Sequence, residues 1–107
     1  MKEVKGVIDA HTHIFPPHQI ENRQQLSETD KGFAEIYSDP KAQLADADQL
    51  LEIIDDVFFL GAVAAGFAFL EESVAREQNE YLLEVAKETP SIIPFVNINL
   101  RWDNWMR

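Results

Sequence analysis

The amino-acid sequence predicts an α/β fold in which about three parallel strands alternate with helices. Apolar segments of strand length recur along the chain, segments with a helical period stand between them, and glycine or proline lies near most boundaries. The expected order is strand, loop, helix, strand, helix, strand. This order is typical of parallel βαβ units with right-handed crossovers.

The first expected strand runs from Val4 to His13. Successive side chains of a strand point to opposite faces, so Asp9, His11 and His13 are expected on one face. The strand therefore brings three potentially functional side chains to one surface.

A polar segment and then a helix are expected next. Residues 18–38 have no clean period and are expected to form a long irregular loop. A loop of this length is typical of a functional segment, so we interpret it as an active-site loop. Ser38-Asp39-Pro40 is expected to start the helix, with a capping residue before proline. The expected apolar stripe of this helix is Leu44, Ala47, Leu51, Ile54 and Phe58.

The second half of the chain is expected to hold two more strands and one helix. Gly61 is expected to end the first helix, and residues 62–69 are apolar on both faces, as in a buried parallel strand. Residues 71–89 are expected to form a helix, residues 92–100 the third strand, and residues 102–105 could open a further helix. The inward stripe expected for the helix over 71–89 is Val74, Gln78, Tyr81, Leu82 and Val85.

Composition excludes several classes of function. The 107 residues suffice for one small domain, and the net charge of −10 argues against nucleic acid or an anionic membrane as partner. The chain has no cysteine, so disulfides and thiolate metal sites are excluded. The N-terminus has no apolar segment of the signal-peptide kind, and a cytoplasmic location is expected.

The His11-Thr12-His13 segment points to metal chemistry. Histidines two apart project from one face of a strand and suit two nitrogen ligands on one ion, at about 2.0–2.1 Å each for zinc. They stand at the C-terminal end of a strand, where (β/α)8 enzymes place their active sites. Asp9 could orient one imidazole by a hydrogen bond. Two polar residues at a loop entry are the simpler interpretation, but the apolar strand before them and the proline pair after them favour a metal site.

The segment VIDAHTHIFPP, residues 7–17, resembles the opening strand of the amidohydrolase superfamily, specifically its "amidohydrolase 2" branch. The likeness continues through residues 44–56, 64–67, 79–81 and 93–97, and so covers nearly the whole chain; His-x-His is its specific part. That branch contains metal-dependent hydrolases, lactonases and nonoxidative decarboxylases related to aminocarboxymuconate-semialdehyde decarboxylase.

The resemblance implies a fold, a cofactor and a reaction. It implies that residues 1–107 are the N-terminal part of a (β/α)8 TIM barrel, in βαβαβ order, and that His11 and His13 hold a divalent ion, commonly zinc. The remaining ligands and a catalytic aspartate would come from later strands. We therefore expect no catalytic residue in this chain, and negligible hydrolase activity from it alone. The implied reaction is attack of a metal-activated water on an ester, lactone or amide-type bond of a small-molecule substrate.

Five further residues are candidates for substrate binding. His18 could reach the mouth of the site, although a solvated histidine is the simpler interpretation. Phe33 and Tyr37 could form part of a lid, or could anchor their segment on the core. Asn97 and Asn99 are expected to face the barrel interior, where they could bind substrate or hydrogen-bond to loop backbone.

Two classes of function stay open. The first is an enzyme, either a hydrolase or a nonoxidative decarboxylase. The second is a non-catalytic metal-binding or assembly module. In either class, three strands with two helices are expected to leave open edges and an apolar face, so we expect copies to associate into a homo-oligomer.

Overall fold

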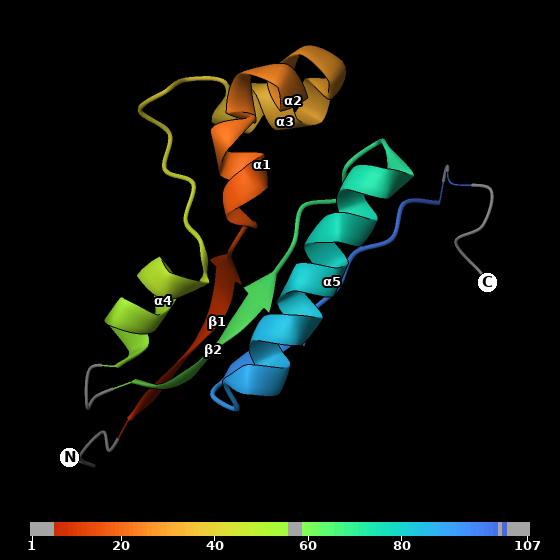
Figure 1. Ribbon diagram of the computed structural model, residues 1–107. Helices are drawn as coiled ribbons and strands as arrows, with labels where there is room; N and C mark the ends of the chain where they lie inside the picture. The colour runs from red at the N-terminus through yellow and green to blue at the C-terminus, as the bar shows by residue number, and fades with distance from the viewer. Residues whose placement is uncertain (1–5, 56–58, 101, 103–107) are drawn as a thin grey trace.

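The computed structural model describes residues 6–55, 59–100 and 102. Within them, three strands form one parallel sheet in the order β1-β2-β3, with helices between them along the chain (Figure 1). The predicted α/β alternation with parallel strands is confirmed. The elements are β1 (Val7–His13), α1 (Pro17–Glu21), α2 (Arg23–Thr29), α3 (Lys31–Tyr37), α4 (Ala47–Ile54), β2 (Phe59–Ala65), α5 (Glu72–Glu88) and β3 (Ile92–Phe95).

Helices α4 and α5 cover one face of the sheet. Tyr81 of α5 links them, because its hydroxyl accepts a hydrogen bond of 2.8 Å from the main-chain N–H of Ala47 at the start of α4. Burial raises the pKa of Tyr81, so its hydroxyl stays neutral near neutral pH. The buried apolar residues between the helices and the sheet are Ile14, Ala47, Leu50, Ile54, Ala62, Ala64, Leu82 and Ile92.

The opposite face of the sheet is open among the described residues. The register places Val63 beside Ile93 and Ala65 beside Phe95, alternating with the pairs that face the helices. Ile93 and Phe95 are 44% and 58% exposed, and Ile8 of β1 is 53% exposed. Exposed apolar side chains of this kind agree with the predicted self-association, which stays a prediction.

The segment after β1 is helical, so the irregular loop predicted over residues 18–38 is wrong. The chain changes direction at Asn22 and at Asp30, which separate α1, α2 and α3. Asp30 begins α3, and its carboxylate accepts a hydrogen bond of 3.1 Å from the main-chain N–H of Phe33. Helices of 5 to 7 residues are too short to repeat an apolar pattern, which is why no period is visible. The three helices follow the carboxyl end of β1 and extend beyond the sheet (Figure 1).

The helix predicted to start at Ser38-Asp39-Pro40 starts instead at Ala47, with Asp46 as its N-cap. Asp46 and Gln49 form a capping box, in which each side chain accepts a hydrogen bond from the other residue's main-chain N–H. Asp39 caps a turn instead, since its carboxylate accepts from the main-chain N–H of Lys41 at 2.9 Å. Leu44 is therefore buried ahead of the helix rather than within it.

The strand predicted over residues 62–69 is β2, and it begins and ends earlier than expected. Gly61 lies inside this strand, not at the end of the preceding helix. A Cβ atom at Gly61 would collide with the main-chain oxygen of Ser91, which accepts the Ala62 N–H at 3.0 Å. The glycine is thus needed for close approach of the turn before β3. Phe58, predicted to end the helical stripe, lies outside the described residues.

Replacing Gly61 by alanine should lower the free energy of unfolding by about 1–3 kcal/mol, because the backbone at Ser91 must move to admit a methyl group. Urea unfolding measures the loss. Gly32→Ala in α3 is the matched control, since the nearest atoms to its Cβ would lie at 3.6 and 3.7 Å. That variant should be neutral or stabilised by up to about 1 kcal/mol. Equal effects at both glycines would contradict the close-approach argument.

The predicted helix over residues 71–89 is confirmed as α5, whereas the third strand is shorter than predicted. β3 ends at Phe95, and beyond it the main chain bonds to α5 instead of to a strand. The Asn79 side chain accepts a hydrogen bond from the Asn97 N–H at 3.0 Å and donates one to the Asn97 carbonyl at 2.8 Å. Trp102 is buried and its indole N–H donates to the Leu70 carbonyl. The further helix suggested at residues 102–105 lies largely outside the described residues.

None of the helices described has the length and apolar character that crossing a membrane requires.

Candidate metal centre

His11 and His13 come together at the carboxyl end of β1. Their Nε2 atoms lie 2.9 Å apart, and the ring centroids 4.9 Å apart with an interplanar angle of 66°. Both residues are exposed, and the register pairs His13 with Ala65 of β2, which in turn pairs with Phe95 of β3. The two imidazoles therefore lie on the open face of the sheet, opposite α4 and α5.

The spacing of the two nitrogens fits two ligands of one metal ion. Two nitrogens that bind a zinc ion at 2.0–2.1 Å are about 3.3 Å apart in tetrahedral geometry and about 2.9 Å apart in octahedral geometry. The observed 2.9 Å lies at the short end of that range. Without an ion, one ring donates a hydrogen bond to the other at this distance, and the tautomers decide which ring is the donor. A bound cation would take the place of the hydrogen between the two nitrogens.

No group of three or more histidine, cysteine or carboxylate side chains is placed to hold a metal among residues 6–55, 59–100 and 102. His11 and His13 are thus two ligands without a described third. Catalytic zinc sites use three protein ligands and keep one position for water or substrate. The described part of the chain can supply part of such a site.

Asp9 lies on the face of β1 opposite the two histidines, so the prediction that it shares their face is wrong. Asp9 pairs with Ala62 and Thr12 with Ala64, so two residues of β1 between these pairs, Ala10 and His11, stand against one residue of β2, Val63. This bulge reverses the alternation of the strand. The Asp9 carboxylate stabilises it by accepting a hydrogen bond of 3.0 Å from the main-chain N–H of His11. The Asp9 carboxylate thus bonds to the backbone that carries His11 rather than to an imidazole.

A cavity of about 280 Å³ adjoins His13 between the end of β1 and α4. Tyr37 contributes to its lining, together with apolar side chains that include Phe15 and Leu50. Burial raises the pKa of Tyr37, so the phenol remains a neutral hydrogen-bond donor. Among the residues predicted to bind substrate, Tyr37 is therefore the one that shares a cavity with His13.

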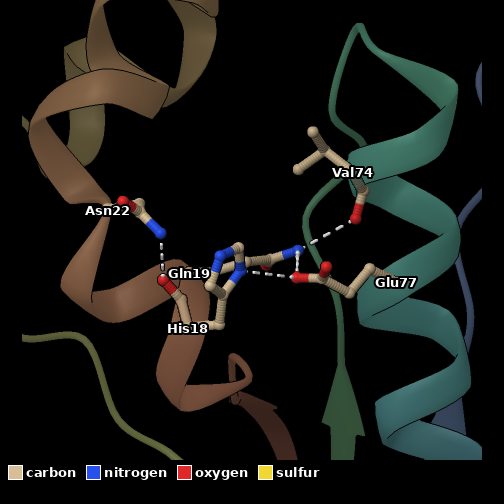
Figure 2. Close-up of polar contacts among 5 residues, drawn as sticks. All are labelled: His18, Gln19, Asn22, Val74 and Glu77. Carbon is tan, nitrogen blue, oxygen red and sulfur yellow. Dashed lines mark hydrogen bonds and ion pairs between the residues drawn. The ribbon is translucent and has the colours of Figure 1, made fainter.

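His18 lies on α1 and is directed to α5 instead of to the two histidines. Its Nδ1 lies 3.2 Å from an oxygen of Glu77, the same oxygen that accepts a hydrogen bond from Gln19 (Figure 2). Gln19 is buried and also donates to the Val74 carbonyl at 2.9 Å. The side chains of His18 and Glu77 are 71% and 47% exposed, so their ion pair adds little to stability. The geometry supports a surface contact between α1 and α5.

Phe33 is fully buried, which favours the anchoring role over the lid role. Its ring makes edge-to-face or tilted contacts with four aromatic rings, at centroid distances of 5.1 to 6.2 Å. These rings belong to Phe15, Tyr37, Phe67 and Phe69. A second core, distinct from the one under the sheet, therefore joins α3 to the segments that follow β1 and β2.

Asn97 and Asn99 follow the end of β3, outside the strand predicted to carry them. The main chain of Asn97 is hydrogen-bonded to the Asn79 side chain. The Nδ2 atom of Asn97 is buried and has no hydrogen-bond partner in the described structure. A buried donor cannot reach a substrate in solution without rearrangement. Nor does Nδ2 bond to loop backbone: the described hydrogen bonds at Asn97 run between its main chain and the Asn79 side chain.

Sequence reasoning missed the structural role of Gln78. It lies at an inward position of α5, is fully buried, and bonds to main-chain atoms after β1 and after β2. The signal for this role in the sequence was the position of Gln78, a polar residue in the otherwise apolar stripe of the helix over residues 71–89. Buried polar side chains are normally hydrogen-bonded, so such a residue indicates main-chain partners nearby.

Comparisons of the chain with models of protein families, with curated proteins and with solved structures found no match.

Proposed function

We propose that this chain forms part of a metal-dependent hydrolase of the amidohydrolase type, in which His11 and His13 bind one divalent ion, zinc in the first instance. The observation that carries the proposal is the 2.9 Å separation of the two Nε2 atoms at the carboxyl end of a parallel strand. Active sites of α/β barrels lie at this end of their strands.

The residues of the chain have defined tasks in this proposal. His11 and His13 bind the ion through Nε2, and the bulge at Asp9 directs both rings to the open face of the sheet. A divalent ion held there would lower the pKa of water and would polarise a carbonyl group. The substrate class is a small molecule with an ester, lactone or amide-type bond. The cavity that His13 and Tyr37 line lies on the α4 side of β1, so the substrate would approach the ion from the open face of the sheet.

A tetrahedral zinc ion would keep two positions beyond the two imidazoles. Those positions require ligands from outside the described residues, from a second copy of the chain, or from the substrate and water. The proposal therefore separates metal binding, which depends on His11 and His13, from turnover, which depends on the completed site.

Metal content per chain tests the proposal. Untagged protein and the His11→Ala/His13→Ala variant are dialysed against zinc and analysed for bound metal. The native chain should retain close to one ion per chain and the variant none, since the two imidazoles are the proposed ligands. His18→Ala is the matched control: it removes an exposed histidine outside the site and should retain the metal. Equal metal in the native and double-variant proteins would overturn the proposal.

Turnover is a separate measurement. The native protein is incubated with zinc and with representative esters, lactones and amides. Zinc-dependent hydrolysis that the double variant lacks would support the catalytic part of the proposal. Binding of one zinc ion without turnover is the expected result for this chain alone, since turnover depends on the completed site, and it would leave the metal site in place.

A further inference from the structure

Gln78 joins the ends of two strands through one side-chain amide. Its Nε2 donates a hydrogen bond of 3.1 Å to the main-chain oxygen of Ile14, the residue after His13. Its Oε1 accepts a hydrogen bond of 2.7 Å from the main-chain N–H of Phe67, two residues after the end of β2. One partner is an acceptor and the other a donor, so the orientation of the amide is determined by its contacts.

This amide lies where pairing of β1 and β2 stops. The last register pair is His13 with Ala65, and the chain then continues to α1 on one side and toward α5 on the other. Separating strands leave main-chain donors and acceptors without partners, and burial makes such groups costly. The Gln78 amide supplies both missing partners and takes the place of a peptide unit in the ladder.

Gly66 makes room for this arrangement. A Cβ atom at Gly66 would lie 2.8 Å from Oε1 of Gln78 and 3.0 Å from Nδ2 of Asn97. Gln78 itself is fully buried, so the bond to Ile14 is shielded from competing water. The contact is therefore part of a close-packed site and not a mobile surface bond.

We propose that Gln78 is a positioning residue for the metal centre: by holding the carbonyl of Ile14, it stops β1 from fraying back to His13 and keeps the two imidazoles at their mutual spacing. This inference rests on the proposed function. Gln78 lies on the helix side of the sheet and touches neither imidazole in any described contact. Its effect passes through the main chain of β1.

Asn79 provides a matched comparison on the same helix. Its side chain also makes two hydrogen bonds to main chain, but both go to Asn97 after β3. Removing either side-chain amide should destabilise the fold to a similar degree, since each leaves one main-chain N–H and one carbonyl unpaired. Only Gln78 is connected to the strand that bears the histidines.

The experiment compares Gln78→Met, which keeps most of the volume, with Asn79→Leu. Zinc dissociation constants are measured by competition with a chromophoric chelator, and unfolding free energies by urea. Gln78→Met should weaken zinc binding about 10- to 100-fold, the range found for residues that orient metal ligands. Asn79→Leu should lose similar stability but bind zinc within about twofold of the native chain. Unchanged affinity in Gln78→Met, or an equal loss in both variants, would overturn the inference.

A metal-free measurement separates the failure of this inference from failure of the proposed function. The nuclear Overhauser effect between the His11 and His13 rings reports their contact in the apo protein. It should weaken in Gln78→Met and persist in Asn79→Leu. If the native chain binds no zinc but the ring contact still depends on Gln78, the metal proposal fails and the positioning role stands. If the ring contact is the same in all proteins, the positioning role fails whatever the metal result.

Gln78→Glu provides a second variant should Gln78→Met not fold. It keeps the acceptor for the Phe67 N–H and loses the donor to Ile14 once its carboxyl is ionised. Burial favours the neutral carboxyl, so the ring contact is followed from neutral to alkaline pH, and it should weaken as the carboxylate forms, because the lost bond is the one to β1. A ring contact equal to that of the native chain would overturn the inference.

Discussion

Replacing Phe33 by alanine should lower the free energy of unfolding by about 4 kcal/mol, within the 3–5 kcal/mol typical of buried aromatic residues. Phe33 is 0% exposed and touches four aromatic rings, so truncation removes a large apolar surface and leaves a cavity. Urea unfolding followed by circular dichroism measures the loss.

The control for Phe33 lies on the same helix. Ile36 is 57% exposed, and Ile36→Ala should change the unfolding free energy by less than about 0.5 kcal/mol. A loss below about 1 kcal/mol in Phe33→Ala would mean that the second core does not fold cooperatively with the sheet. In that case Tyr37 of α3 would not be held firmly in the lining of the cavity that His13 shares.

Replacing Asp30 by alanine should lower the free energy of unfolding by about 3 kcal/mol. Its two carboxylate oxygens accept hydrogen bonds from different segments, from the Phe33 N–H at 3.1 Å and from the Leu70 N–H at 2.8 Å. The first bond caps α3, which is worth about 1 kcal/mol, and the second is a charge-assisted bond worth about 1.5–3 kcal/mol. Because Asp30 is 5% exposed, the Leu70 N–H would find little water as a substitute.

Asp39→Ala is the matched control for Asp30. Asp39 also accepts from a main-chain N–H, that of Lys41, but both residues are exposed and water can replace the bond. That variant should lose less than about 1 kcal/mol. Limited proteolysis gives a local readout, since Asp30→Ala should open cleavage within residues 18–38 before global unfolding. Equal stability losses at the two aspartates would contradict the role assigned to buried Asp30.

The fold class could be predicted because it depends on hydrophobic patterns that repeat over many residues and on the order of strands and helices. Helix α5 has a period that extends over 17 residues, and parallel strands between helices leave few arrangements of the chain. The boundaries could not be predicted equally well. Ser38-Asp39-Pro40 and Asp46 both carry helix-start residues, and only the reciprocal bonds between Asp46 and Gln49 decide between them.

The site could be predicted in part for a similar reason. The shared direction of His11 and His13 follows from their separation by one residue, and the structure places their nitrogens together. The direction of Asp9 could not be predicted, because the bulge after it depends on pairing with β2. The connection of Gln78 to the site could not be predicted from the sequence. Its partners are main-chain atoms of Ile14 and Phe67, which lie 64 and 11 residues earlier in the chain.

The bulge in β1 couples the direction of the two imidazoles to the burial of Ile14. Shifting the register of residues 11–14 against β2 by one residue would place the side chains of His11 and His13 on the face covered by α4. The same shift would expose Ile14, which is 0% exposed in the structure, to solvent. Exposing that side chain would cost about 1.5–3 kcal/mol, and burying two imidazoles without partners would cost more. Burial of Ile14 thus stabilises the register in which His11 and His13 face away from α4. Substitutions that shrink Ile14 would weaken that preference without touching either histidine.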